Sequence, residues 1–180
     1  MVIPAGTHHL GPENGTLSLR TGRTGAAAKA GHDLLIEVTS WSATVTAGDD
    51  PADTAITLDA DGGSLRVIEG TGGMKSLTED DKADIVTVIA DEILKHKDIT
   101  LRSTAVTPDG DGLRVDADLT LHGQPRPVVV DVTPADDGGL RAVAVITQSD
   151  WGVKPYSTLF GALKVADQVT VELDARLPAG

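Results

Sequence analysis

The sequence predicts a mainly β protein, an antiparallel β-barrel of about eight strands with one amphipathic α-helix. Apolar and polar residues alternate with period two in one segment after another, clusters of Gly, Pro and Asp separate the segments, and one stretch has helical spacing. Closing such a sheet removes its exposed edges and turns one face of every strand inward. A β-sandwich is the alternative that the same pattern allows.

Each expected strand has one apolar face, which we assign to the interior. The segment "LRVDADLTL" alternates most regularly. In "LRAVAVITQS" the polar residues Arg141 and Thr147 belong to one face of the strand, so we assign the residues of the other face, which begins with Leu140, to the interior. Trp41 has the opposite parity to the strand before it, so we expect it to face outward, under the helix. The main inward positions are Leu34, Ile36, Val38, Leu101, Leu113, Val115, Ala117, Leu119, Leu121, Val130, Leu140, Ala142, Ala144 and Ile146.

The exception to alternation runs from Thr78 to Lys95, "TEDDKADIVTVIADEILK". Its residues Ile85, Val86, Ile89, Ile93 and Leu94 recur at helical spacing, which predicts an amphipathic helix over about 78–95 that covers part of the barrel. Thr78 is suited to cap the first turn, which is acidic and so complements the positive end of the helix dipole.

Length and composition exclude several classes of protein. At 180 residues the chain is most simply a single domain spanning 1–180. Acidic residues outnumber basic ones 27 to 15 without a basic cluster, which argues against nucleic acid as a partner. No signal peptide or long apolar run is evident, so we expect a cytoplasmic protein with no stable membrane insertion.

The absence of cysteine from the sequence excludes disulfides, zinc-thiolate sites and thiol nucleophiles. Aromatic residues make up only 2% of the chain, so small and aliphatic side chains must line the interior. Two alanines in succession on one inner face, Ala142 and Ala144, leave room there for a ligand. A cavity along strands of this length suits an elongated apolar molecule.

The order of these features resembles the YceI-like family of lipocalin-like barrels that bind polyisoprenoids or similar long lipids. The most specific match is "ITLRSTAV" followed by "LRVDADLTLHGQPRPVVVDV", and "QSDWGVKPYSTLFGALKVADQVTVEL" is similar to the closing strands of the family. "KAGHDLLIEV" resembles the early strand of actinobacterial members, and the likeness spans most of the chain. The segment before "ITLRST" departs from the family, with "LKHKD" where aromatic residues are usual.

The candidate chemical groups have plainer structural interpretations. His122 precedes Gly123 and most simply belongs to a hairpin turn. His32 stands beside Asp33, either as an acid–base pair or as a hydrogen-bonded structural residue near a barrel end. Neither His8, His9 nor any other histidine has a spacing that forces a metal site, so no metal and no cofactor is expected.

The segment "SDWGVKPY" carries Asp150, Lys154 and Tyr156, whose spacing is not typical of a catalytic site. We interpret it as a polar loop at the barrel mouth, with Trp151, Tyr156 and Phe160 covering the opening.

The leading hypothesis is a noncatalytic protein that binds or carries a long apolar lipid, and the resemblance implies an isoprenoid or quinone. One alternative is an enzyme acting on a small molecule at the barrel mouth through His32 or the Tyr156 loop. Another is a filled, stress-related scaffold. Apolar residues on the outer face leave room for a homodimer contact or for packing of the helix, namely Val129, Val143 and Val145. The expected ligand-binding residues are Leu34, Ile36, Val38, Leu101, Ala117, Leu119, Val130, Ala142, Ala144, Trp151, Tyr156 and Phe160.

Overall fold

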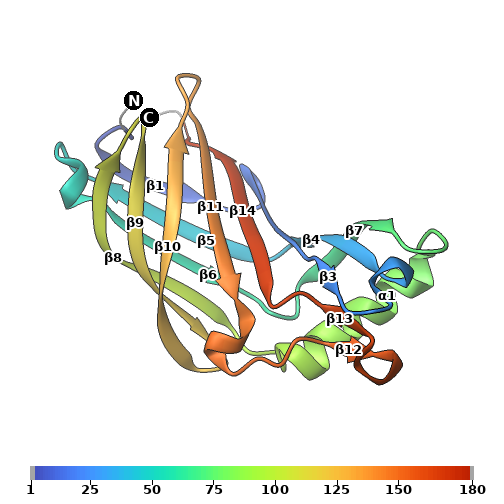
Figure 1. The fold of residues 1–180 in the computed structure, drawn as a ribbon. Helices are drawn as coiled ribbons and strands as arrows, with labels where there is room; N and C mark the ends of the chain where they lie inside the picture. The colour runs from blue at the N-terminus through green and yellow to red at the C-terminus, as the bar shows by residue number, and fades with distance from the viewer. Residues whose placement is uncertain (1–2, 179–180) are drawn as a thin grey trace.

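The structure, a computed structural model, describes residues 3–178 as a curled antiparallel sheet with a helix at one end (Figure 1). Eleven strands form the main sheet in the order β1-β5-β6-β8-β9-β10-β11-β14-β2-β4-β7, and β12-β13-β3 form a small second sheet. The strands are β1 (Gly6–Leu10), β2 (Gly15–Arg20), β3 (Arg23–Thr24), β4 (His32–Val38), β5 (Trp41–Ala47), β6 (Ala55–Ala60), β7 (Leu65–Gly72), β8 (Ile99–Asp109), β9 (Gly112–Leu121), β10 (Gln124–Pro134), β11 (Gly139–Thr147), β12 (Ser157–Thr158), β13 (Leu163–Val165) and β14 (Gln168–Arg176).

This strand count is larger than the expected eight, and bends explain most of the difference. β1 continues into β2, β4 into β5 and β6 into β7, and each bent pair lies beside the next one with nearly continuous register. β6 also pairs with β8, and β2 pairs with β14. The sheet therefore curls around an interior. The strands β1, β2 and β5 were not predicted from the sequence pattern.

The inward faces of β9 and β11 are confirmed. Val115 is 1% exposed and Ile146 is 5% exposed, and both belong to one large core cluster that the curled sheet encloses. On the opposite face of β11, Val145 is 57% exposed. Period-two alternation thus separates a dry interior from the outer surface.

The outward assignment of Trp41 is wrong, because Trp41 is 6% exposed and belongs to the core cluster. The bend between β4 and β5 provides the reason. Thr39 and Ser40 are both exposed, and the Thr39 amide donates to the carbonyl of Ser64 in the neighbouring bend (2.7 Å). Two consecutive outward residues shift the parity of the strand, so Trp41 points inward.

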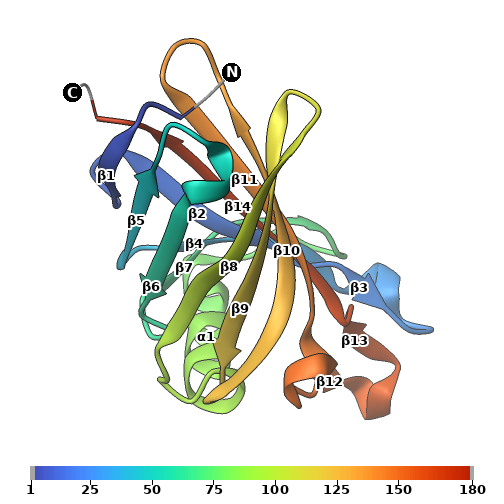
Figure 2. The ribbon, with the colours of Figure 1, turned by 90° about the vertical axis from the view of Figure 1, so that its left-hand side faces the viewer.

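The predicted segment is helical, as α1 (Glu79–Val88) and a π turn (Ile89–Ile93). No residue of α1 is buried, so α1 does not cover the barrel with an apolar face; only the π turn, through Ala90 and Ile93, packs inward. Thr78 and Asp81 form a reciprocal capping box. The pKa of the Asp81 carboxyl is held below its usual value, mainly by the hydrogen bond that it accepts from the Thr78 amide. The side-chain hydrogen bond with Thr78 lowers the pKa further. α1 packs against β7 at the end of the sheet away from both termini (Figure 2).

The turn at His122 is also confirmed. β9 ends at Leu121 and β10 begins at Gln124, so His122 and Gly123 form a two-residue hairpin loop. Both residues have positive φ, at 53° and 73°, as a type I′ turn requires. His122 Nε2 donates to the carbonyl of Ile93, which ties the hairpin to the π turn. His122 therefore joins two structural elements at this end of the barrel.

We expect Gly123→Val to lower the melting temperature, because a β-branched residue strains a backbone at positive φ by roughly 1–2 kcal/mol. A Cβ at this position meets nothing within 4 Å, so the cost is conformational rather than steric. Gly123→Asn is the matched control, since Asn tolerates this conformation. Equal melting temperatures for the two variants would contradict the turn assignment.

Candidate ligand-binding site

The interior of the curled sheet holds a small apolar cavity of about 100 Å³. Its walls are aliphatic side chains from both halves of the sheet, with almost no polar surface. Among the described residues no buried side-chain nitrogen or oxygen lacks a hydrogen-bond partner. The cavity is lined by Ile3, Leu10, Leu17, Ala43, Val45, Ile56, Leu58, Leu101, Val115, Val130, Val132, Leu140, Ala142, Ala144, Val171 and Leu173.

The wall of the sheet is incomplete between β10 and β11. β10 pairs with β9 from Gln124 to Val132, and β11 pairs with β14 along its whole length. Between β10 and β11, however, pairing covers only Asp131–Pro134 and Leu140–Val143. The two strands separate beyond this point, so the ladder that joins them is interrupted over half of β11.

Two prolines lie on the unpaired part of β10, beyond Val129, and they prevent the ladder from being resumed there. Pro125 and Pro127 lie opposite Thr120 and Asp118 of β9. Backbone groups of alternate residues in an antiparallel strand point to opposite neighbours, and a proline cannot donate to either. Pro125 and Pro127 therefore share the edge that faces β11, and both lack the N–H that would extend the ladder there.

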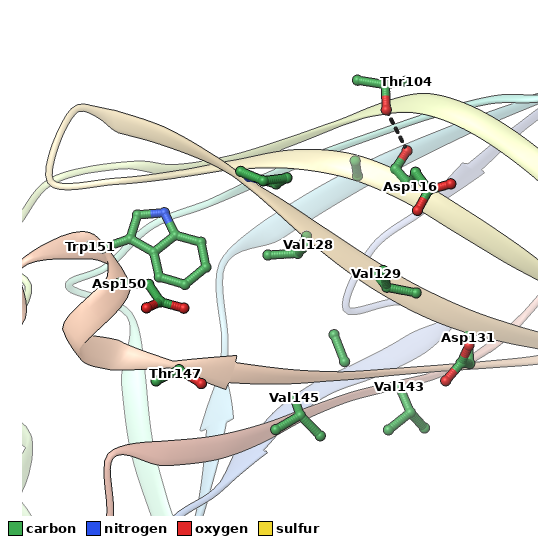
Figure 3. A pocket seen from close by; sticks show the side chains of 13 residues that line it. Thr104, Asp116, Val128, Val129, Asp131, Val143, Val145, Thr147, Asp150 and Trp151 are labelled. Atoms are coloured by element: carbon green, nitrogen blue, oxygen red, sulfur yellow. Dashed lines mark hydrogen bonds between the residues drawn. The ribbon is translucent and has the colours of Figure 1, made fainter.

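The separation creates a lateral slot of about 460 Å³ (Figure 3). Residues from both faces of the sheet line the slot. Val128 and Ala144 point toward the interior, whereas Val129 and Val145 belong to the outer face. Ala144 also lines the interior cavity, so the two spaces share a wall. The slot is lined by Thr104, Asp116, Ala117, Pro127, Val128, Val129, Asp131, Val143, Ala144, Val145, Thr147, Asp150 and Trp151.

Trp151 covers one end of this slot. It ends a short 3-10 turn (Gln148–Trp151) that follows β11, and it is 2% exposed. Its indole Nε1 donates to the carbonyl of Leu119 in β9 (2.9 Å). The side chain thus spans the separated strands, as Figure 3 shows.

The residues expected to bind a ligand fall into distinct regions. Four of them line the interior cavity: Leu101, Val130, Ala142 and Ala144. Ala117, Ala144 and Trp151 line the slot. Val38 and Leu119 are buried in the core cluster without lining either space.

The other four lie away from both spaces. Leu34 is half-buried, and Ile36 is fully buried outside the core cluster, because β4 extends beyond the barrel toward β7. Tyr156 is 44% exposed and the ring of Phe160 lies fully in solvent, so neither covers an opening.

Among the described residues the histidines and acids do not gather into a metal-binding group. His32 Nε2 donates to the carbonyl of Lys75 (2.7 Å), whereas Asp33 forms an ion pair with Arg23 (3.5 Å). Neighbouring residues of a strand point to opposite faces, which explains why His32 and Asp33 have separate partners.

The slot was not predicted from the sequence, although three of the residues that line it stand out there as apolar positions on the outer face. Val129, Val143 and Val145 were assigned to a dimer contact or to helix packing, and in the structure they line the slot while α1 packs against β7. The signal that was available is the spacing of Pro125 and Pro127, which places both missing N–H groups on one edge.

The chain belongs to the YceI-like family, since the YceI-like domain model matches residues 21–177. This is a family of lipocalin-like barrels known to bind polyisoprenoids. The fold is similar to that of Burkholderia cenocepacia BcnA, with a TM-score of 0.64 and 20% identity over 92% of this chain and 96% of that chain. It is also similar to the Campylobacter jejuni YceI protein, with a TM-score of 0.56 and 14% identity over 81% and 85% of the two chains.

At these identities the structural likeness shows the fold alone. No curated protein matches the chain. Within residues 3–178, no helix has the length and apolar character needed to cross a membrane.

We expect Pro127→Thr to extend the ladder between β10 and β11. The register of Asp131 and Val143, continued along both strands, places residue 127 opposite Thr147, and the new amide gains a carbonyl to which it can donate. Slow hydrogen exchange of this amide and a raised melting temperature would follow. Pro108→Thr, on the exposed part of β8, is the control. Fast exchange at residue 127 would contradict the proline explanation.

Proposed function

We propose that this protein binds a long apolar lipid of the isoprenoid or quinone class without transforming it. The observation that carries the proposal is the aliphatic interior cavity that shares Ala144 with the slot in the wall. Removing apolar surface from water is favourable by about 25 cal/mol per Å², so an extended chain gains several kcal/mol without a specific polar contact. Selectivity then depends on the width and length of the chain.

The volumes define how such a chain is held. Pockets for drug-sized ligands usually measure about 300–1,000 Å³. The interior cavity, at about 100 Å³, holds only a short part of a lipid, whereas the slot measures about 460 Å³. In our proposal the chain therefore lies partly in the slot and partly in the interior, and it passes Ala144.

A noncatalytic role is supported by the separation of the candidate reactive groups. His32 and Asp33 have different partners, and Tyr156 lies outside both the cavity and the slot. A catalytic site needs a nucleophile or base within hydrogen-bond reach of a bound substrate.

The small volume of the interior favours a second candidate, a filled barrel that acts as a scaffold. In that case the curled sheet carries no lipid, and added side-chain volume only strains the core by about 1–3 kcal/mol. The two functions differ in the effect of a substitution at Ala144, because only a carrier loses a ligand there.

Ala144→Leu is the direct test. We expect the variant to fold and to bind retinol, a fluorescent isoprenoid alcohol, about tenfold more weakly than the parent, because the added methyl groups occupy the path of the chain. Ala105→Leu makes the same change at an exposed position on β8 and should leave the affinity unchanged. A destabilised Ala144→Leu protein whose parent binds no retinol would support the scaffold instead.

The lining of the slot predicts a preference for the head group of the lipid. Its charged residues are the carboxylates Asp116, Asp131 and Asp150, and no basic residue in the described part of the chain lines the slot or the cavity. A carboxylate head is repelled there and has no cationic partner. We expect retinol to bind more tightly than retinoic acid in fluorescence titrations at low salt. Equal or tighter binding of retinoic acid would contradict this part of the proposal.

A further inference from the structure

We propose that the slot between β10 and β11 is the entrance through which the apolar chain reaches the interior, so that the ligand is loaded through the side of the barrel and not through an end. This inference rests on the proposed function. It concerns the route taken by the lipid, and the experiment below separates its failure from the failure of lipid binding.

Each end of the barrel has a contact that lies across it. At one end His122 donates to the carbonyl of Ile93, which joins the β9–β10 hairpin to the π turn that follows α1. At the other end, beside the termini, Ile3 is 2% exposed and lines the interior cavity, so the N-terminal segment covers that side. Entry through an end requires one of these contacts to break.

Entry of a lipid through the slot breaks no backbone ladder. Pairing of β10 with β11 ends at Asp131 and Val143, and beyond that point no backbone ladder joins the two strands. The ladder between β6 and β8 is equally short, with four residue pairs. The other neighbouring pairs around the curled wall have ladders of five to nine residue pairs or continue through a bend into one. The slot therefore lies beside one of the shortest ladders of the wall.

The slot and the interior cavity adjoin at Ala144, which lines both. Val145 is 57% exposed at the outer side, Ala144 is 9% exposed behind it, and Ala144 is part of the wall of the interior cavity. Ala144 therefore stands between the two spaces, and its side chain is small. Val128 and Val129 provide apolar contacts along the opposite side of the slot.

The side chain of Trp151 blocks one end of the slot. Its ring is buried in the slot, and its indole N–H donates to the carbonyl of Leu119. Because the residue belongs to a short turn after β11 and not to a strand, displacing it breaks no ladder. A rotation of this side chain would widen the opening.

The test is to close the slot covalently. The sequence contains no cysteine, so a Val129→Cys/Val145→Cys double variant introduces the only two thiols, at positions that the continued register places opposite each other. Dibromobimane joins the two thiols in the folded protein. We measure retinol uptake by stopped-flow fluorescence. We expect uptake to slow by about tenfold or more after crosslinking, because the crosslink keeps β10 and β11 from separating further at the slot.

Thr133→Cys/Arg141→Cys is the matched control, since these positions are paired in the intact part of the same two strands. Crosslinking there should leave the rate of uptake unchanged. A crosslinked Val129/Val145 variant that takes up retinol at the uncrosslinked rate would overturn lateral entry while leaving lipid binding intact. A parent protein that binds no retinol at all would overturn the proposed function and the entrance with it.

A single substitution provides a second test of entry through the slot, which can be used if the double cysteine variant does not fold. Val145→Trp places a large ring at the outer side of the slot, where the native side chain is already exposed. We expect the same slowing of retinol uptake, whereas Thr107→Trp on the exposed face of β8 should have no effect. Equal rates for these two variants would count against lateral entry.

Discussion

The alternation of apolar and polar residues along antiparallel strands is the constraint on which the rest of the structure depends. A strand presents successive side chains to opposite faces, so a sheet that curls can enclose only one of its two faces. In this protein the enclosed face consists mainly of valine, leucine, isoleucine and alanine, with Trp41 and Trp151 as its two aromatic residues. A dry interior with little polar surface follows directly from that composition, and it is the property that suits an apolar chain.

The same backbone hydrogen bonds that hold the wall together also define where it opens. Pro125 and Pro127 remove two donors from one edge of β10, and the ladder to β11 stops after Asp131. The break lies beside Ala144, where the interior has its smallest side chains. One local feature of the sequence thus links strand pairing, the shape of the cavity and access to it.

Much of the fold could be predicted from the sequence, because the determining signals are local. The alternation in β9 and β11, the capping box at Thr78 and the His-Gly turn each specify their own conformation without distant contacts. Trp41 was misplaced because the bend at Thr39 and Ser40 depends on a hydrogen bond to Ser64, which lies far along the chain.

The site was harder to predict. Membership of Ala142 and Ala144 in the cavity wall followed from parity, but the slot depends on which strand lies beside β10. Tyr156 and Phe160 were assigned to the barrel mouth because they are aromatic and follow Trp151, yet they lie in solvent. Side chains in irregular segments have no periodicity from which an orientation can be inferred.

The most direct test of the account is to extract the purified, folded protein with organic solvent and to identify the extract by mass spectrometry. A carrier that holds its ligand partly in the slot and partly in the interior should yield an apolar lipid in stoichiometric amount, and the Ala144→Leu variant should yield much less. A parent protein that yields no lipid, and that takes up none when isoprenoid is added during purification, would contradict lipid binding as its function.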